Sequence, residues 1–144
     1  MNYKKIFLKK GKESSLLRFH PWVFSGAVAY SDKNITEGEI VEVYTSSKEF
    51  IAVGHYQIGS IAVRVLSFNQ QTIDKAFWTK RLTAAYQMRK DLGLDYTDTH
   101  SSFRLVHGEG DFLPGLIVDF YGSTAVMQAH SVGMHLHREE IAQC

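Results

Sequence analysis

Basic and aromatic side chains gather around a proline turn near the start of the chain, in the stretch Arg18-Phe-His-Pro-Trp-Val-Phe-Ser-Gly-Ala27. Aromatic faces can stack on unpaired bases while neighbouring cations hold phosphates, which is how single-stranded RNA is recognised. The alternative is plain packing, with Trp22 and Phe24 on one face of a strand and His20 hydrogen-bonded at the turn. The local sequence favours the packing interpretation for Trp22, and both interpretations can hold for different residues.

A second group of polar residues lies in the glycine-rich stretch 107–116, where Glu109 and Asp111 are two residues apart. Two carboxylates can act as acid and base or hold a hard cation. The EF-hand pattern is absent, and Leu113 breaks the dinucleotide-binding pattern that Gly108-Glu-Gly110 would begin. We therefore favour a structural turn, in which the carboxylates accept backbone N–H groups or pair with Arg104.

Three histidines near the C-terminus, His130, His135 and His137, are a third candidate. Zinc sites use histidine, but this spacing matches neither H-E-x-x-H nor a Cys/His finger. We expect exposed or hydrogen-bonded histidines and no metal, and keep a metal-dependent enzyme as a minor hypothesis. The single cysteine, Cys144, has no partner cysteine and is assigned no role.

Composition and charge indicate a folded protein of a reducing compartment. The 144 residues are 44% hydrophobic and 22% charged, with one cysteine. No apolar run approaches the roughly 18 residues of a membrane span, and the N-terminus lacks the apolar core of a signal peptide. We expect a cytoplasmic protein with no membrane partner.

Positive charge is concentrated in two blocks, although the net charge is only +1. Residues 1–18 carry six basic and one acidic residue, and residues 74–92 carry five basic and two acidic residues. Such blocks can attract a polyanion locally. Either block by itself is more simply explained as a solvated surface.

The elements expected in the first half are short strands that form a small barrel or sandwich, together with a helical turn over 14–19 that buries Leu16 and Leu17. This unit ends near residue 70. The expected strands cover residues 3–9, 39–44 (half-buried), 50–55 and 61–68.

A helix is expected next, capped by Thr72 and ended by Gly93. Its buried apolar stripe is predicted to consist of Trp78, Leu82, Ala85 and Leu92. Much of the rest of its surface is predicted to carry Lys75, Lys80, Arg81, Arg89 and Lys90. After a polar loop at 95–102, strands are expected at 103–106, 116–120 and 124–130, with helical residues from 134. The fold class is α+β.

Two long motifs resemble a known bacterial family in their order and separation. They are Lys10-Gly-Lys-Glu…Leu16-Leu-Arg…His20-Pro-Trp-Val-Phe-Ser-Gly-Ala27 and Phe103-Arg-Leu-Val-His-Gly-Glu-Gly-Asp-Phe-Leu-Pro-Gly-Leu-Ile-Val-Asp-Phe-Tyr-Gly122. Between them, Ala52-Val-Gly-His-Tyr56, Arg64 and the Arg81…Arg89 helix also fit. The chain resembles the start of the class I S-adenosylmethionine (SAM)-dependent rRNA large-subunit methyltransferases that make 5-methylcytosine in 23S rRNA.

The resemblance implies a PUA domain over 1–70, a small pseudo-barrel that binds structured RNA, and the start of a central α+β domain over 73–144. It also implies that a Rossmann-like catalytic domain, which holds the SAM-binding glycine loop and the nucleophilic cysteine, is absent from this chain. We therefore expect a chain that is inactive by itself and binds no SAM. Residue 144 is then where a longer enzyme was cut.

The predicted partner is rRNA, with a homodimer left open. The predicted RNA contacts are Lys9, Lys10, Lys12, Arg18, His20 and Trp22, and the basic helix extends the surface. The sequence departs from the family pattern at four residues, Ser14, Phe19, Phe112 and Phe120. These differences weaken the assignment of individual RNA contacts from the family to this chain. The alternative is a stand-alone RNA-binding adaptor without enzymatic activity.

Overall fold

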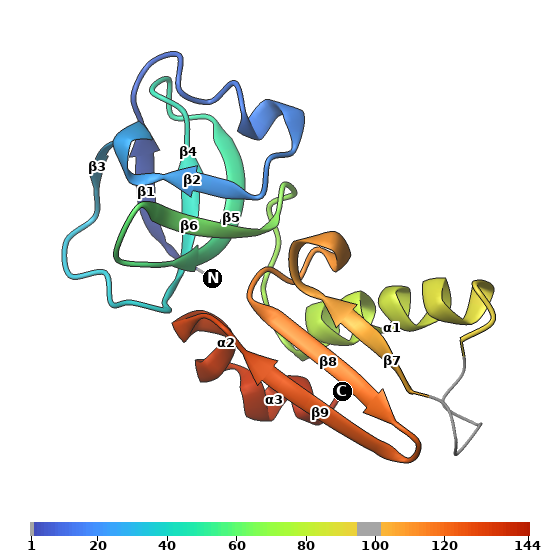
Figure 1. Cartoon of the computed structure of the whole chain (residues 1–144). Helices are drawn as coiled ribbons and strands as arrows, with labels where there is room; N and C mark the ends of the chain where they lie inside the picture. The colour runs from blue at the N-terminus through green and yellow to red at the C-terminus, as the bar shows by residue number, and fades with distance from the viewer. Residues whose placement is uncertain (1, 95–101) are drawn as a thin grey trace. The chain divides into compact units, whose positions relative to one another are not determined.

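The computed structural model describes residues 2–94 and 102–144, which form an α+β protein of two compact units, Met1–Thr72 and Ile73–Cys144 (Figure 1). Most of the polar loop expected at 95–102 lies outside the described residues. No helix among the described residues is long and apolar enough to cross a membrane.

The first unit is built on a curled six-stranded sheet with the strand order β2-β6-β5-β4-β1-β3. Strands β1 and β4 pair in parallel, and the other neighbours pair antiparallel. Its elements are β1 (Lys4–Leu8), η1 (Leu16–Arg18), β2 (Trp22–Phe24), η2 (Ser25–Ala27), β3 (Val28–Ser31), β4 (Ile40–Tyr44), β5 (Phe50–Tyr56) and β6 (Ile61–Ser67). The four predicted strands are confirmed as β1, β4, β5 and β6. Strand β3 was missed because it is an edge strand with mostly exposed residues, so its sequence carries no apolar alternation.

The core of this unit comes from alternate residues of the strands, such as Ile6 and Leu8 of β1 and Val41 and Val43 of β4. The prediction that β4 is half-buried was wrong, because both of its faces are covered. Its Glu42 is buried yet satisfied, since it accepts hydrogen bonds from the Tyr44 hydroxyl (2.8 Å) and from Gln70 Nε2 (2.9 Å). Burial, together with this bond to Glu42, raises the pKa of Tyr44.

The helical turn expected at 14–19 is the short helix η1, and it buries only one of its two leucines. Leu16 lies in the core, whereas Leu17 is 65% exposed, so its predicted inward position was wrong. The turn stops at Phe19, whose backbone is left-handed (φ 61°) and whose N–H donates to the Leu16 carbonyl. A turn this short has one side facing the core and cannot bury two successive residues.

In its described residues, the second unit has a three-stranded antiparallel sheet in the order β7-β8-β9, three α-helices and one short 3-10 helix. Its elements are α1 (Lys75–Asp91), β7 (Ser102–His107), η3 (Gly108–Asp111), β8 (Leu116–Tyr121), β9 (Thr124–Ala129), α2 (Val132–Leu136) and α3 (Arg138–Ala142). The three predicted strands and the helical C-terminal segment are confirmed. Helix α1 packs against β7 and α3.

Helix α1 corrects three sequence expectations. Its N-cap is Asp74, whose carboxylate accepts the Phe77 N–H (3.0 Å), and Thr72 lies outside the helix. Leu92, placed in the buried stripe, is 73% exposed because it follows the last helical residue. Arg89, placed on the solvated side, is buried.

The close approach of β5 to β6 predicts a strong effect of a single methyl group. A Cβ added at Gly54 would lie 2.2 Å from the Arg64 carbonyl oxygen, which is backbone and cannot turn aside. We expect Gly54→Ala to lower the free energy of unfolding by roughly 1–3 kcal/mol, the usual cost of overpacking, in urea denaturation. Gly26→Ala is the matched control, because its Cβ would meet nothing within 4 Å. Equal stability of the two variants would contradict the packing described here.

Candidate nucleic-acid interface

The basic segment that follows β1 is tied by its first lysine to the short helix η2. Lys9 donates from its backbone N–H to the Ala27 carbonyl (2.9 Å) and from Nζ to the Gly26 carbonyl (2.9 Å). Lys10 and Lys12 are exposed on either side of Gly11, which turns the chain with a φ of +80°. The segment therefore presents positive charge from a fixed position beside η2.

Arg18 and His20 belong to the turn that enters β2. Arg18 is exposed, and its Nε donates to the Ser14 carbonyl (3.3 Å). The His20 backbone N–H donates to the Ser15 carbonyl (3.0 Å), and its Nδ1 accepts the Trp22 N–H (3.2 Å). The ring is thereby oriented relative to the indole, as the packing interpretation of this turn expected.

The aromatic residues of β2 lie on the outer side of the sheet. Val23 is buried in the core, so its neighbours Trp22 and Phe24 point the other way, and Phe24 is 47% exposed. With His20 they form a triangle of rings, hereafter the ring cluster, with centroid separations of 5.8, 5.9 and 6.2 Å. The expected packing on one face is present, and that face is partly open to solvent.

Sequence reasoning did not connect Arg64 with this site. In the antiparallel register of β2 and β6, Arg64 lies directly opposite Trp22, and its guanidinium is 5.7 Å from the centre of the indole. Its Nε donates to Gln57 Oε1 (2.7 Å), which holds the side chain in place. Because 42 residues separate the two partners, only the strand pairing brings them together.

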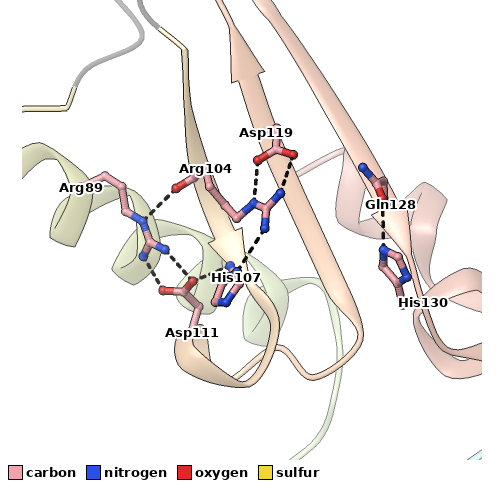
Figure 2. A network of polar contacts seen from close by, with 7 residues as sticks. All are labelled: Arg89, Arg104, His107, Asp111, Asp119, Gln128 and His130. Carbon is pink, nitrogen blue, oxygen red and sulfur yellow. Dashed lines mark hydrogen bonds and ion pairs between the residues drawn. The ribbon is translucent and has the colours of Figure 1, made fainter.

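The stretch 107–116 forms a brace in the second unit (Figure 2). Asp111 is buried and forms a two-bond ion pair with Arg89 of α1, which includes the contact of Arg89 Nη2 with Asp111 Oδ2 (2.7 Å). Asp111 also accepts the His107 N–H (2.6 Å), and Arg89 Nε donates to the Arg104 carbonyl (3.0 Å). The structural interpretation of Asp111 is confirmed, because it accepts a backbone N–H as one of the two expected alternatives, and the cation it pairs with is Arg89 rather than Arg104.

Arg104 instead pairs across the sheet with Asp119. Its Nε and Nη2 donate to the two carboxylate oxygens (2.8 and 3.2 Å), and Nη1 lies 3.3 Å from His107 Nδ1 (Figure 2). These bonds lower the pKa of Asp119. The pair therefore stays ionised at neutral pH and ties β7 to β8.

Two of the three C-terminal histidines have different hydrogen-bond partners, and the third is exposed. His130 Nε2 lies 3.1 Å from Gln128 Oε1, and His137 Nδ1 lies 2.9 Å from the Gly133 carbonyl. His135 is exposed. Within 2–94 and 102–144, no group of three or more His, Cys, Asp or Glu side chains is arranged to hold a metal ion.

The brace predicts that Asp111→Asn destabilises the protein strongly. Losing one partner of a buried ion pair leaves an uncompensated charge and costs about 3–5 kcal/mol, so we expect a fall of this size in the free energy of unfolding. Asp119→Asn is the matched control, since it removes the same charge from a pair whose arginine is exposed, and its loss should be much smaller. Equal losses measured by denaturant titration would show that the Asp111 pair is not the brace.

Comparison with known proteins places these features in a family context. Residues 6–68 match the PUA-like domain family. The chain is 42% identical over 140 residues to ribosomal RNA large subunit methyltransferase I of Citrobacter koseri and 42% identical over 136 residues to that of Erwinia tasmaniensis. The corresponding Escherichia coli protein is 40% identical over 136 residues. Each alignment covers 93% of this chain and 34% of the relative, so the chain spans about a third of the length of the curated relatives it matches.

Solved structures share the fold at low sequence identity. A chain described as a SAM-dependent methyltransferase from Streptococcus mutans superposes with a TM-score of 0.79 at 18% identity, over 96% of this chain and 36% of that one. A second structure, described as a methyltransferase complexed with SAH, gives 0.80 at 18% identity with the same coverage. Residues 6–68 thus match a PUA-like domain, and the chain is similar, along nearly all its length, to part of the large-subunit rRNA methyltransferases I.

Proposed function

We propose that this chain is the N-terminal, RNA-recognising portion of a SAM-dependent methyltransferase of 23S rRNA that acts on C5 of cytosine. The similarity to rRNA methyltransferases and the PUA-like match over 6–68 support an RNA substrate. The role of the chain is to hold rRNA in the position from which a catalytic domain methylates the base. We propose that it acts in the cytoplasm.

One observation carries this proposal: cations and outward aromatic rings occur together on the PUA-like unit. The Lys9 side chain is bonded to η2, which directly follows Phe24 of the ring cluster. Lysines neutralise phosphates, and aromatic rings stack on bases, so the pair of features suits a single-stranded or looped RNA. We propose Lys9, Lys10, Lys12, Arg18, His20 and Trp22 as RNA contacts, and residues 1–70 as the RNA-binding domain.

The methyl-transfer chemistry is proposed to reside outside the matched third of the relatives. Two carboxylates of the family-like motif in the second unit are held in ion pairs, Asp111 with Arg89 in the brace and Asp119 with Arg104 across the sheet. SAM supplies the methyl group in such enzymes. We propose that residues 73–144 belong to a central domain, and that this chain by itself neither binds SAM tightly nor transfers methyl groups.

The phosphate contacts predict a measurable salt dependence of RNA binding. Each phosphate neutralised on a single strand contributes about 0.7 to the slope of log affinity against log salt. We expect Lys10→Ala/Lys12→Ala to weaken binding to a 23S rRNA fragment and to reduce this slope by about 1.4, as measured by fluorescence anisotropy.

The matched control is Lys33→Ala/Lys48→Ala, which removes the same charge from two exposed lysines of the same unit outside the proposed site. This variant should keep the slope of the unaltered chain. An immeasurably small slope for the unaltered chain would reject RNA binding through phosphates. Equal losses in both variants would reject this surface as the RNA site.

A further inference from the structure

Arg64 adds a planar cation to the ring cluster from the opposite strand. Its guanidinium lies over the Trp22 indole at 5.7 Å, in the range of a cation–π contact, and Gln57 holds it there. Arginine in this arrangement offers a fork of donors that matches a phosphate, beside rings that match a base. Together, the rings and the guanidinium match the base and the phosphate of one nucleotide.

We propose, on the basis of the function proposed above, that Arg64 and the ring cluster bind one unpaired RNA nucleotide. The base stacks on the exposed ring of Phe24, to which the Trp22 ring is nearly perpendicular (87°), and its phosphate faces the Arg64 guanidinium. A paired base presents only its edges to a protein surface, so stacking of this kind requires an unpaired nucleotide. The site therefore selects a loop, a bulge or a single-stranded end.

A second aromatic surface of the same unit offers a comparison. The rings of Tyr30, Phe7, Tyr44 and Phe50 follow one another across four adjacent strands, with neighbouring centroids 4.6–5.9 Å apart. Its charged groups include the Glu42 carboxylate, which accepts from the Tyr44 hydroxyl, and the Lys5 ammonium, 5.1 Å from the centre of the Tyr44 ring. The ring cluster adjoins a guanidinium, whose planar fork of donors matches a phosphate better than an ammonium does, so this chemistry favours the cluster as the RNA site.

The experiment follows the fluorescence of Trp22 in a Trp78→Phe background, because Trp78 is the other tryptophan and is fully buried in the second unit. The probes are octaadenylate RNA and a fully paired, GC-rich RNA duplex. We expect the single strand to quench the indole and the duplex to leave it nearly unchanged. If Trp78→Phe fails to fold, protection of the unaltered chain from acrylamide quenching reports the same event.

Phe24→Ala and Arg64→Ala should each weaken single-strand binding by roughly fivefold to a hundredfold, the range for loss of one base-stacking contact. Arg64→Lys should keep the salt slope of the unaltered chain and still lose affinity. Tyr30→Ala, which removes an exposed ring of the second aromatic surface, should change affinity less than twofold.

This inference is overturned if RNA binds without any change in Trp22 fluorescence. It is also overturned if Tyr30→Ala loses more RNA affinity than Phe24→Ala does. In both cases RNA recognition by the chain still stands. The same holds if Phe24→Ala and Arg64→Ala bind RNA normally, since the cluster would then be a surface for a protein. Absence of salt-dependent RNA binding in the unaltered chain would overturn the proposed function as well.

Discussion

The first unit depends on the contact between the backbones of β5 and β6 at Gly54. The absence of a side chain there lets the Arg64 carbonyl approach to a distance that no Cβ would tolerate. With the backbone of Arg64 fixed in this way, its side chain projects over Trp22 on the neighbouring strand β2. Gly54 of β5 therefore helps to position the Arg64 guanidinium, which is the cation of the proposed nucleotide site, on the outer face of the sheet.

The second unit is organised around the buried ion pair of Arg89 and Asp111. Desolvating two charges is expensive, and the cost is offset only where every donor and acceptor is satisfied. Here the guanidinium also bonds the Arg104 carbonyl, and the carboxylate also accepts the His107 N–H. Helix α1, strand β7 and the glycine-rich turn are thus tied at one point, which gives Asp111 of the acidic loop a structural role.

Strand positions were predictable from the sequence because short runs rich in β-branched and aromatic residues are bounded by glycine and polar turns. Prediction failed where tertiary structure overrides local pattern, as for Arg89, which reads as a surface cation and becomes the buried partner of Asp111. The exposed edge strand β3 gave no pattern to detect. For the candidate site, the turn around His20 and Trp22 was visible as a motif, whereas Arg64 needed the strand register.

The central claim is that rRNA is recognised by the PUA-like unit through the segment from Lys9 to Phe24. Ultraviolet crosslinking of the chain to 23S rRNA fragments, followed by mass spectrometry of the crosslinked peptides, tests it most directly. The account predicts crosslinks within residues 9–24 and at the peptide that contains Arg64. Crosslinks confined to residues 73–144, or none above the level of an unrelated RNA, would contradict it.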